Sequence, residues 1–178
     1  MFFVFEGLDG CGKSTLIKNY KALLESEGRE VYLTREPGGT PLGEELRDTL
    51  LTIKKSQDFK ISPRAELLLY EASRAQHVDQ IIRPKVTAGE VVLCDRFTAS
   101  SVAFQALWNS AFSDSKRKLG MNQPLDRLES EKADFHNAVS QSYKEQVDLN
   151  PENWLVLDGR LNPSDLLTAL VEGLKKFW

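Results

Sequence analysis

A glycine-rich turn near the start of the chain restricts its possible folds more than any other feature. Residues 2–6 form an apolar run typical of a strand, and residues 7–14 (Gly-Leu-Asp-Gly-Cys-Gly-Lys-Ser) fit the pattern G-x-x-x-x-G-K-S/T at the start of a helical pattern. Glycines at these positions let backbone N–H groups surround an anion, and the following helix adds its positive end. The pattern therefore predicts a cradle for the phosphates of a nucleoside triphosphate.

Side chains of the cradle and of a later run have predicted roles as well. Lys13 would reach the β and γ phosphates, and the hydroxyl of Ser14 would bind Mg²⁺. Asp95 follows the apolar run at residues 91–94, where a carboxylate can orient the metal or its waters. The residues predicted to bind the triphosphate are Gly7, Leu8, Asp9, Gly10, Cys11, Gly12, Lys13, Ser14 and Thr15, and those predicted to hold the metal are Ser14 and Asp95.

Apolar runs alternate with helical patterns along the chain. Four strands are predicted, at residues 2–6, 30–34, 91–94 and 154–157. Helices are predicted at residues 14–27, 42–51, 63–73, 78–82 and 125–147, and from Pro163 to the C-terminus. Continuous apolar strands between helices are typical of a parallel sheet with helices on both faces. We expect one α/β domain over residues 1–178, with a lid at about residues 113–127.

Charge and composition exclude several classes of function. The 178 residues include 23 basic and 26 acidic side chains, a net charge of −3 that argues against a general nucleic-acid binder. No apolar run approaches the roughly 20 residues that span a bilayer, so no membrane segment is expected. The apolar start has no basic residues before it and ends at Glu6, unlike a signal peptide. The two cysteines cannot form a disulfide framework, and a reducing, cytoplasmic setting is expected.

Three arginines indicate what accepts the phosphoryl group. Arg35 and Arg96 follow predicted strands, on the side where ligands bind in open parallel sheets, and Arg74 lies in a predicted helix. The guanidinium fork matches phosphate oxygens, so these residues favour an acceptor that is itself a phosphate. Such an acceptor needs no strong general base, because its oxygen is already anionic. Two alternatives stay open: a deoxynucleoside kinase with Glu36 as general base, and a nucleotide-binding protein without turnover.

Separate motifs, in the right order, resemble the thymidylate kinase family. They are residues 5–15 (FEGLDGCGKST), 35–43 (REPGGTPLG), 66–70 (ELLLY) with 74–77 (RAQH), 95–97 (DRF) with 100–105 (SSVAFQ), and 126–129 (DRLE) with Phe135. The segment at 35–43 is the most specific of these. The resemblance implies a P-loop fold like that of nucleoside-monophosphate kinases, with a parallel sheet flanked by helices and a lid. It also implies ATP- and Mg²⁺-dependent phosphorylation of dTMP to dTDP by a protein that is usually a homodimer.

The resemblance assigns further roles to individual residues. Asp9 would bind the 3′-hydroxyl of the deoxyribose and help place the acceptor phosphate, which Arg35 and Arg96 would hold. The thymine ring would stack on Tyr70, and Arg74 would donate to its O4 carbonyl, which disfavours cytosine. The remaining members of the predicted substrate site are Glu36, Ser100 and Gln105, the last two lining the base pocket.

The family splits by whether a catalytic basic residue comes from the cradle or from the lid. Residues 8–11 contain no arginine, so the lid would supply it, and Arg117, Lys118 and Arg127 are the candidates. With Lys13, Asp9 and Arg96, the residues Arg117 and Arg127 complete the predicted catalytic set.

The resemblance is interrupted between Gln105 and Asp126, where only 20 residues are present. The family has there a glycine-arginine loop, a helix, and a strand carrying Pro-Asp-Leu-Thr that lies beside the cradle strand. None of these is visible, which would leave strand edges unpaired. Either a segment is missing from this sequence, or the chain is a shortened variant whose sheet is completed in another way.

Overall fold

The computed structural model describes residues 1–51, 61–111 and 133–175. The strands are β1 (Phe2–Phe5), β2 (Val31–Arg35) and β3 (Val91–Asp95). The α-helices are α1 (Lys13–Ser26), α2 (Pro41–Leu51), α3 (Pro63–His77), α4 (Arg83–Thr87), α5 (Thr98–Ala111), α6 (Ala133–Leu149) and α7 (Pro163–Leu174). A π-helical turn (Val78–Ile82) joins α3 to α4, and a short 3₁₀ helix (Pro151–Asn153) follows α6.

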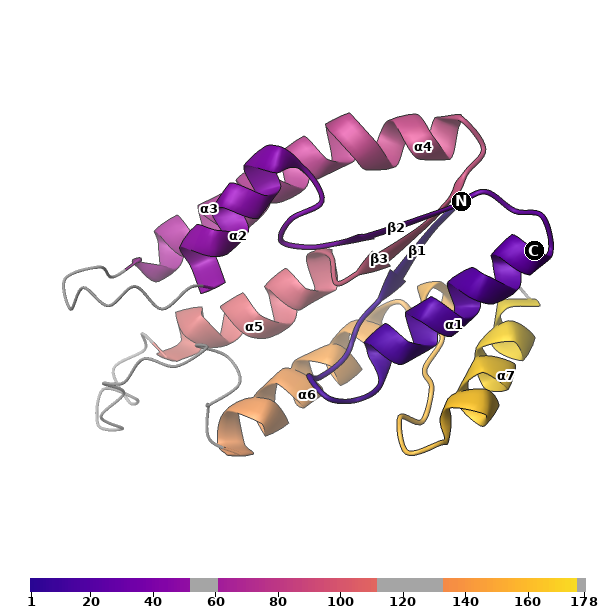
Figure 1. Cartoon of the computed structure of the whole chain (residues 1–178). Helices are drawn as coiled ribbons and strands as arrows, with labels where there is room; N and C mark the ends of the chain where they lie inside the picture. Colours follow the sequence, from indigo (N-terminus) through magenta and orange to yellow (C-terminus); the bar gives the residue numbers. More distant parts are fainter. Residues whose placement is uncertain (52–60, 112–132, 176–178) are drawn as a thin grey trace.

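The three strands form a parallel sheet in the order β1-β3-β2, which confirms the predicted α/β class. Their register places Phe5 and Arg35 on either side of Asp95, so the three strands end in one row. In Figure 1, α1 and α7 lie on one side of the strands, and α2, α3 and α4 lie together on the other. This row of strand ends is where the loops carrying the predicted site residues begin.

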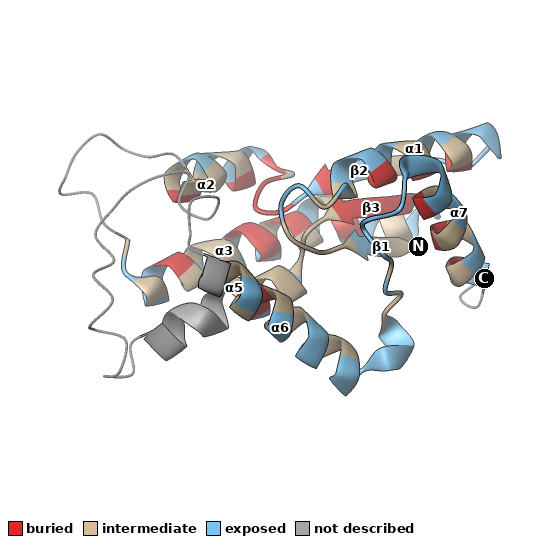
Figure 2. Cartoon of the chain, turned by 90° about the horizontal axis from the view of Figure 1, so that it is seen from below, coloured by how far each residue is buried: buried red, intermediate tan, exposed pale blue. Residues whose placement is uncertain are grey.

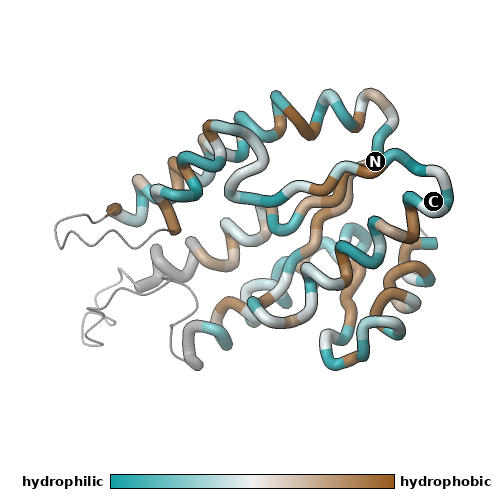
Figure 3. Tube along the Cα trace, in the orientation of Figure 1, coloured by the Kyte–Doolittle hydropathy of each residue, from teal (hydrophilic) through white to brown (hydrophobic). Residues whose placement is uncertain are grey.

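Helix α1 is held between the sheet and α7 by a continuous apolar core. Its buried members on α1 are Leu16, Ile17, Tyr20 and Leu24, which pack with Val91 and Leu93 of β3 and with Leu166, Leu170 and Leu174 of α7. Strand β3 is buried along most of its length, as expected for a central strand covered on both faces (Figure 2). Figure 3 shows the same concentration of hydrophobic residues along the strands and α7. This packing fixes the helix that follows the glycine-rich turn.

Two helix starts behave as their sequences predict. Ser62 accepts a hydrogen bond from the Ala65 amide before Pro63, and Asn162 accepts from the amides of Ser164 and Asp165 around Pro163. Proline in the first turn costs no helical hydrogen bond, and the polar cap satisfies amides that the helix leaves free. Helix α5 was not predicted, because residues 98–111 show only a weak separation of polar and apolar positions.

The predicted fourth strand at residues 154–157 is not formed. Leu155 and Leu157 pack against the core while Val156 is 68% exposed, so the side chains alternate as in a strand. A strand also needs a neighbour whose backbone pairs with it, and among the described residues only β1, β2 and β3 belong to the sheet. The prediction of a paired strand covered on both faces is therefore wrong for this segment, although Leu155 and Leu157 do pack against the core.

Several predictions fall on residues outside the described ranges. These are the lid at residues 113–127, its candidates Arg117, Lys118 and Arg127, the part of the predicted helix before Ala133, and the side chain of Gln105. The rest of that helix is confirmed as α6. Among the described residues, no helix is both long and apolar enough to cross a membrane.

Candidate active site

The glycine-rich turn leaves β1 and enters α1 through backbone conformations that favour glycine. Gly10 has a φ of 75° and Gly12 a φ of 93°, both in the left-handed region. The first helical hydrogen bond runs from the Leu16 amide to the Gly12 carbonyl at 3.0 Å. The amides of residues 13–15 therefore precede the helical ladder and are available to an anion at the positive end of α1.

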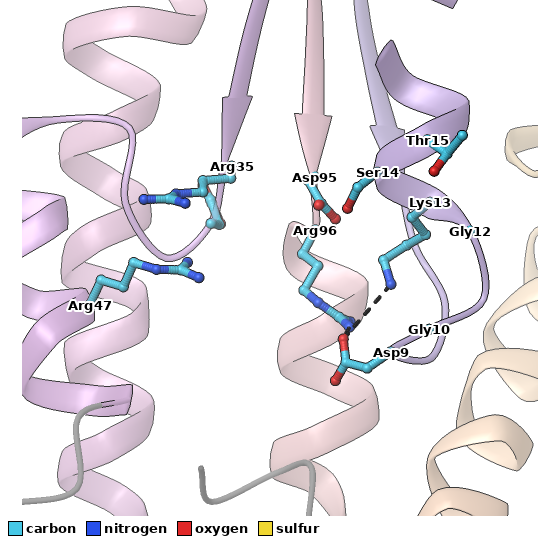
Figure 4. Close-up of a pocket in the computed structure, with 11 residues that line it drawn as sticks. Asp9, Gly10, Gly12, Lys13, Ser14, Thr15, Arg35, Arg47, Asp95 and Arg96 are labelled. Carbon is cyan, nitrogen blue, oxygen red and sulfur yellow. Dashed lines mark hydrogen bonds and ion pairs between the residues drawn. The ribbon is translucent and has the colours of Figure 1, made fainter. Parts of the chain in front are cut away.

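Lys13 folds back over this turn. Its ammonium group donates to the carbonyls of Gly7 (3.0 Å) and Leu8 (2.8 Å) and lies 4.0 Å from the Asp9 carboxylate. The charge thus stands at the mouth of the cradle, where Figure 4 shows it beside Asp9 and Arg96. A short movement of the ammonium group would exchange the two carbonyls for phosphate oxygens.

An open cavity of about 410 Å³ lies at the row of strand ends. Its lining residues are Asp9, Gly10, Gly12, Lys13, Ser14, Thr15, Arg35, Glu36, Arg47, Asp95 and Arg96. Arg35 and Arg47 reach it from one side, and Lys13 and Arg96 stand on the other (Figure 4). Four cations converge on one cavity, which makes it suited to more than one phosphate group.

Arg96 is held by groups from three separate parts of the chain. It directly follows β3 with a φ of 68°, a left-handed conformation that costs a residue with a side chain about 1–2 kcal/mol. Its guanidinium donates to Asp9 (2.5 Å), to Ser100 (3.2 Å) and to Tyr143 of α6 (3.4 Å). Strain at one backbone position, together with a fixed side chain, is typical of a functional residue.

A partly buried carboxylate, that of Glu6, contacts two of the groups that hold Arg96, Ser100 and Tyr143. Glu6 accepts hydrogen bonds from the Phe97 amide (2.8 Å), from the Ser100 hydroxyl (2.6 Å) and from the Tyr143 hydroxyl (2.9 Å). Burial raises the pKa of Glu6, although the hydrogen bonds from Ser100 and Phe97 act to lower it. The network joins the residue after β1 to α5 and α6, and it holds Ser100 and Tyr143, which both accept from Arg96.

On the opposite side of the cavity, two arginines stand close to each other. Arg35 donates to Glu44 at 3.0 Å, and Arg47 donates to the Pro37 carbonyl at 2.7 Å. The amide of Gly39, with help from Arg35, keeps the pKa of Glu44 below its ordinary value. Burial, followed by the charge of Arg35, lowers the pKa of Arg47. Two repelling cations at one wall favour a bound anion, which would offset the repulsion.

Asp95 has the character expected of a metal ligand. Its Oδ1 atom is buried and has no hydrogen-bond partner among the described residues. Its carboxylate and the Ser14 hydroxyl point toward one another in Figure 4, and both line the cavity. Carboxylate and hydroxyl oxygens are ligands that Mg²⁺ accepts, usually together with water and substrate phosphates. The predicted pair therefore fits a magnesium ion.

Tyr70, Arg74 and Ser100, which were predicted for the acceptor base, are not among the residues that line this cavity. Arg74 of α3 donates from Nε to Glu36 Oε2 at 2.7 Å and from Nη2 to Ser101 at 2.9 Å, and it also pairs with Glu71. Three of its five N–H groups are engaged by these contacts, and within the described ranges the other two have no hydrogen-bond partner and could donate to a ligand. Tyr70 precedes Arg74 by one turn of α3. Ser100 accepts a hydrogen bond from Arg96.

Several residues at the site were missed in the sequence. Arg47 follows Glu44 by three positions on α2, so this spacing on one helix face was the available signal. Tyr143 lies within the helix predicted at residues 125–147, and its contact with Glu6 spans 137 residues, which no local pattern reveals. Glu6 and His77 lie within the motifs at residues 5–15 and 74–77, and the sequence alone indicates no role for either.

Comparison with known proteins agrees with this geometry. The family model described as thymidylate kinase matches residues 5–114. The thymidylate kinase of Bdellovibrio bacteriovorus is 40% identical over 97% of this chain and 94% of its own length, and that of Bifidobacterium longum is 36% identical over 99% and 98%. The chain belongs to the thymidylate kinase family. A crystal structure of thymidylate kinase from Ehrlichia chaffeensis, 28% identical, superposes with a TM-score of 0.73 over 98% of each chain.

The comparisons also bear on the shortened segment. The alignment with the Bdellovibrio thymidylate kinase runs over 205 positions, more than the 178 residues of this chain, so the relative contains residues with no counterpart here. The family model ends at residue 114, between Gln105 and Asp126, where the motifs indicated a lost helix and strand. Thymidylate kinases phosphorylate dTMP to dTDP, and the fold described above is that of a P-loop nucleoside-monophosphate kinase.

Proposed function

We propose that this chain transfers the γ-phosphoryl group of ATP to dTMP and releases dTDP and ADP. The observation that carries the proposal is the cavity at the strand ends, which has a phosphate cradle on one side and two further arginines on the other. An in-line transfer needs a donor phosphate and an acceptor phosphate in one such space, with cations around both. Lys13, Asp9 and Arg96 are the proposed catalytic residues among those described.

Residues 7–15 would hold the donor. The backbone amides at the start of α1 would bind the β-phosphate, and Lys13 would bridge the β and γ phosphates. Mg²⁺, held through Ser14 and Asp95, would neutralise charge on the phosphates when it is bound. Asp9 would keep Arg96 and Lys13 in place from the cavity wall, since it lies 2.5 Å from the first and 4.0 Å from the second.

Arg35, Arg47 and Arg96 would hold the acceptor phosphate. A phosphate monoester is mostly dianionic at neutral pH, so its oxygen attacks without a general base. The structure gives no support for Glu36 as such a base, because one of its oxygens accepts from Arg74 and the other contacts His77 at 3.0 Å. The alternative of a deoxynucleoside kinase therefore has less support than a nucleotide acceptor.

Thymine would occupy the space beside Arg74. The two free N–H groups of Arg74 would donate to the O4 carbonyl, Tyr70 would stack on the ring, and Ser100 and Gln105 would line the pocket. Cytosine presents an amino group at the same position, which cannot accept from a guanidinium. We further propose that Arg117 or Arg127, in a lid at about residues 113–127, completes the charge, and that the protein is a cytoplasmic homodimer.

A panel of nucleoside monophosphates tests the function. With ATP and Mg²⁺, ADP release is expected with dTMP, at a lower rate with dUMP, and at background with dCMP, dAMP and thymidine. Omission of Mg²⁺ should abolish turnover, since the phosphates would keep their full charge. ATP binding without ADP release under all these conditions would support the nucleotide-binding alternative.

Replacement of Arg47 by methionine is expected to separate binding from stability. The KM for dTMP should rise about 10-fold, because one charged hydrogen bond to the acceptor is worth about 1.5–3 kcal/mol, while the KM for ATP should stay the same. The Tm should be unchanged or higher, because burial and Arg35 already disfavour the charge of Arg47. Arg64→Met, at an exposed position on α3, is the control and should leave the KM for dTMP unchanged. An unchanged KM for dTMP in the Arg47 variant would show that Arg47 does not belong to the acceptor site.

A further inference from the structure

A buried imidazole lies behind the wall of the cavity. The side chain of His77 is fully buried and has a polar neighbour at each ring nitrogen. Nδ1 lies 3.0 Å from Glu36 Oε1, and Nε2 lies 2.7 Å from the hydroxyl of Thr34. A carboxylate only accepts, so Nδ1 carries the proton, and a neutral ring then accepts from Thr34 at Nε2. Both ring nitrogens thus have a hydrogen-bond partner in the tautomer protonated at Nδ1.

Glu36 connects this imidazole to Arg74. Its side chain is 4% exposed, with Oε1 toward His77 and Oε2 at 2.7 Å from Nε of Arg74. A buried carboxylate needs partners for both oxygens, and with one partner lost it is free to rotate about its terminal bond. The contact between Glu36 and His77 therefore helps to orient the Nε side of the Arg74 guanidinium, while Glu71 and Ser101 contact its two other nitrogens.

The same imidazole fixes the loop that follows β2. A Cβ atom added to Gly39 would lie 2.5 Å from Nε2 of His77 and 2.6 Å from the Thr34 hydroxyl, so the glycine backbone packs directly on the ring. This loop carries the Pro37 carbonyl that accepts from Arg47. His77 thus contacts both the loop that positions Arg47, proposed for the acceptor phosphate, and the carboxylate that pairs with Arg74, proposed for the acceptor base.

We propose that His77 is a positioning residue which, through Glu36, holds Arg74 in the orientation that selects the acceptor base. The proposal rests on the function proposed above for Arg74 and adds a residue that touches no substrate. A positioning role differs from a packing role in one respect. Base selection should depend on the contact of Nδ1 with Glu36 and not on the contact of Nε2 with Thr34.

Two substitutions separate these contacts. His77→Asn places an amide nitrogen near the position of Nδ1 and can still donate to Glu36, whereas His77→Gln reaches the position of Nε2 and Thr34. His77→Gln is expected to raise the KM for dTMP about 10-fold and to reduce the preference for dTMP over dCMP, with the KM for ATP unchanged. His77→Asn should stay within about threefold of the wild type in each of these values, since it keeps a polar contact worth about 1 kcal/mol.

A core variant controls for lost stability. Leu170→Ala in α7 should lower Tm by removing buried apolar contacts, with no change in the KM for dTMP. Equal increases in KM for His77→Asn and His77→Gln, in proportion to their loss of Tm, would reduce His77 to a packing role. A wild-type KM for dTMP in His77→Gln would also overturn the proposal.

A spectroscopic measurement tests the contact without any substrate. The ¹⁵Nε–H resonance of Arg74 is assigned by its loss in the Arg74→Lys variant. We expect its proton to exchange slowly with solvent in the wild type and in His77→Asn, and to exchange fast in His77→Gln. Slow exchange in all three proteins would overturn the positioning role. If the exchange pattern holds and the wild type does not phosphorylate dTMP, the proposed function fails and the positioning of Arg74 by His77 stands.

Discussion

Replacement of Lys13 by methionine is expected to lower kcat for phosphoryl transfer to dTMP by at least about 10²–10³-fold. Lys13 is the cation of the cradle, and its ammonium group already lies against the Gly7 and Leu8 carbonyls at the mouth of the turn. Loss of a preorganised charge at the transferring phosphoryl group costs about 3–4 kcal/mol of transition-state stabilisation. The measurement is ADP release at saturating ATP and dTMP.

Lys18→Met is the matched control, because Lys18 lies on the exposed side of the same helix. Both variants remove one positive charge from α1, so a general effect of net charge would appear in both. Full activity in Lys13→Met would contradict the assignment of residues 7–15 as a phosphate cradle. If only Lys13→Met lowers Tm, the cause would be the loss of its contacts with the Gly7 and Leu8 carbonyls. The kcat values would then be compared at a temperature at which both variants are folded.

The sequence was sufficient to predict the cradle, because its function is local. Residues 7–14 combine a turn that needs glycine with a helix start, and each position has a physical reason that does not depend on the rest of the fold. The parallel sheet was also predictable, since continuous apolar runs indicate strands covered on both faces. By contrast, the segment at residues 154–157 has the composition of a strand, and its pairing depends on a neighbour that the described part of the sheet does not contain.

The acceptor side shows where local reasoning ends. Arg35 and Arg96 were predicted to share a site because parallel strands end at the same edge, and the register of Arg35 with Asp95 confirms the basis for this expectation. The partners of Arg96 could not be predicted, because Asp9 and Tyr143 lie far from it in the sequence. Glu36 and Arg74 were each assigned to the substrate separately, and only the structure shows that they contact one another.

Arg96 is the residue at which the fold and the proposed chemistry depend on each other most directly. Its backbone is in the left-handed conformation, and its guanidinium donates to Asp9, Ser100 and Tyr143. Asparagine tolerates the same conformation better than most residues, so Arg96→Asn removes the cation without adding backbone strain. We expect kcat/KM for dTMP to fall about 10²-fold or more, because charged hydrogen bonds to the acceptor phosphate are lost.

Arg96→Lys and Arg83→Met separate the causes of this loss. Lysine keeps the positive charge and lacks the planar fork, so a partial recovery of kcat/KM would assign the remainder of the effect to paired hydrogen bonding. Arg83 is exposed and pairs with Asp79, and its replacement should change neither kcat nor KM. If Arg96→Asn instead lowers Tm and leaves kcat/KM near the wild-type value, Arg96 only stabilises the fold through its contacts with Ser100 and Tyr143. The acceptor phosphate would then depend on Arg35 and Arg47, which face it from the other wall of the cavity.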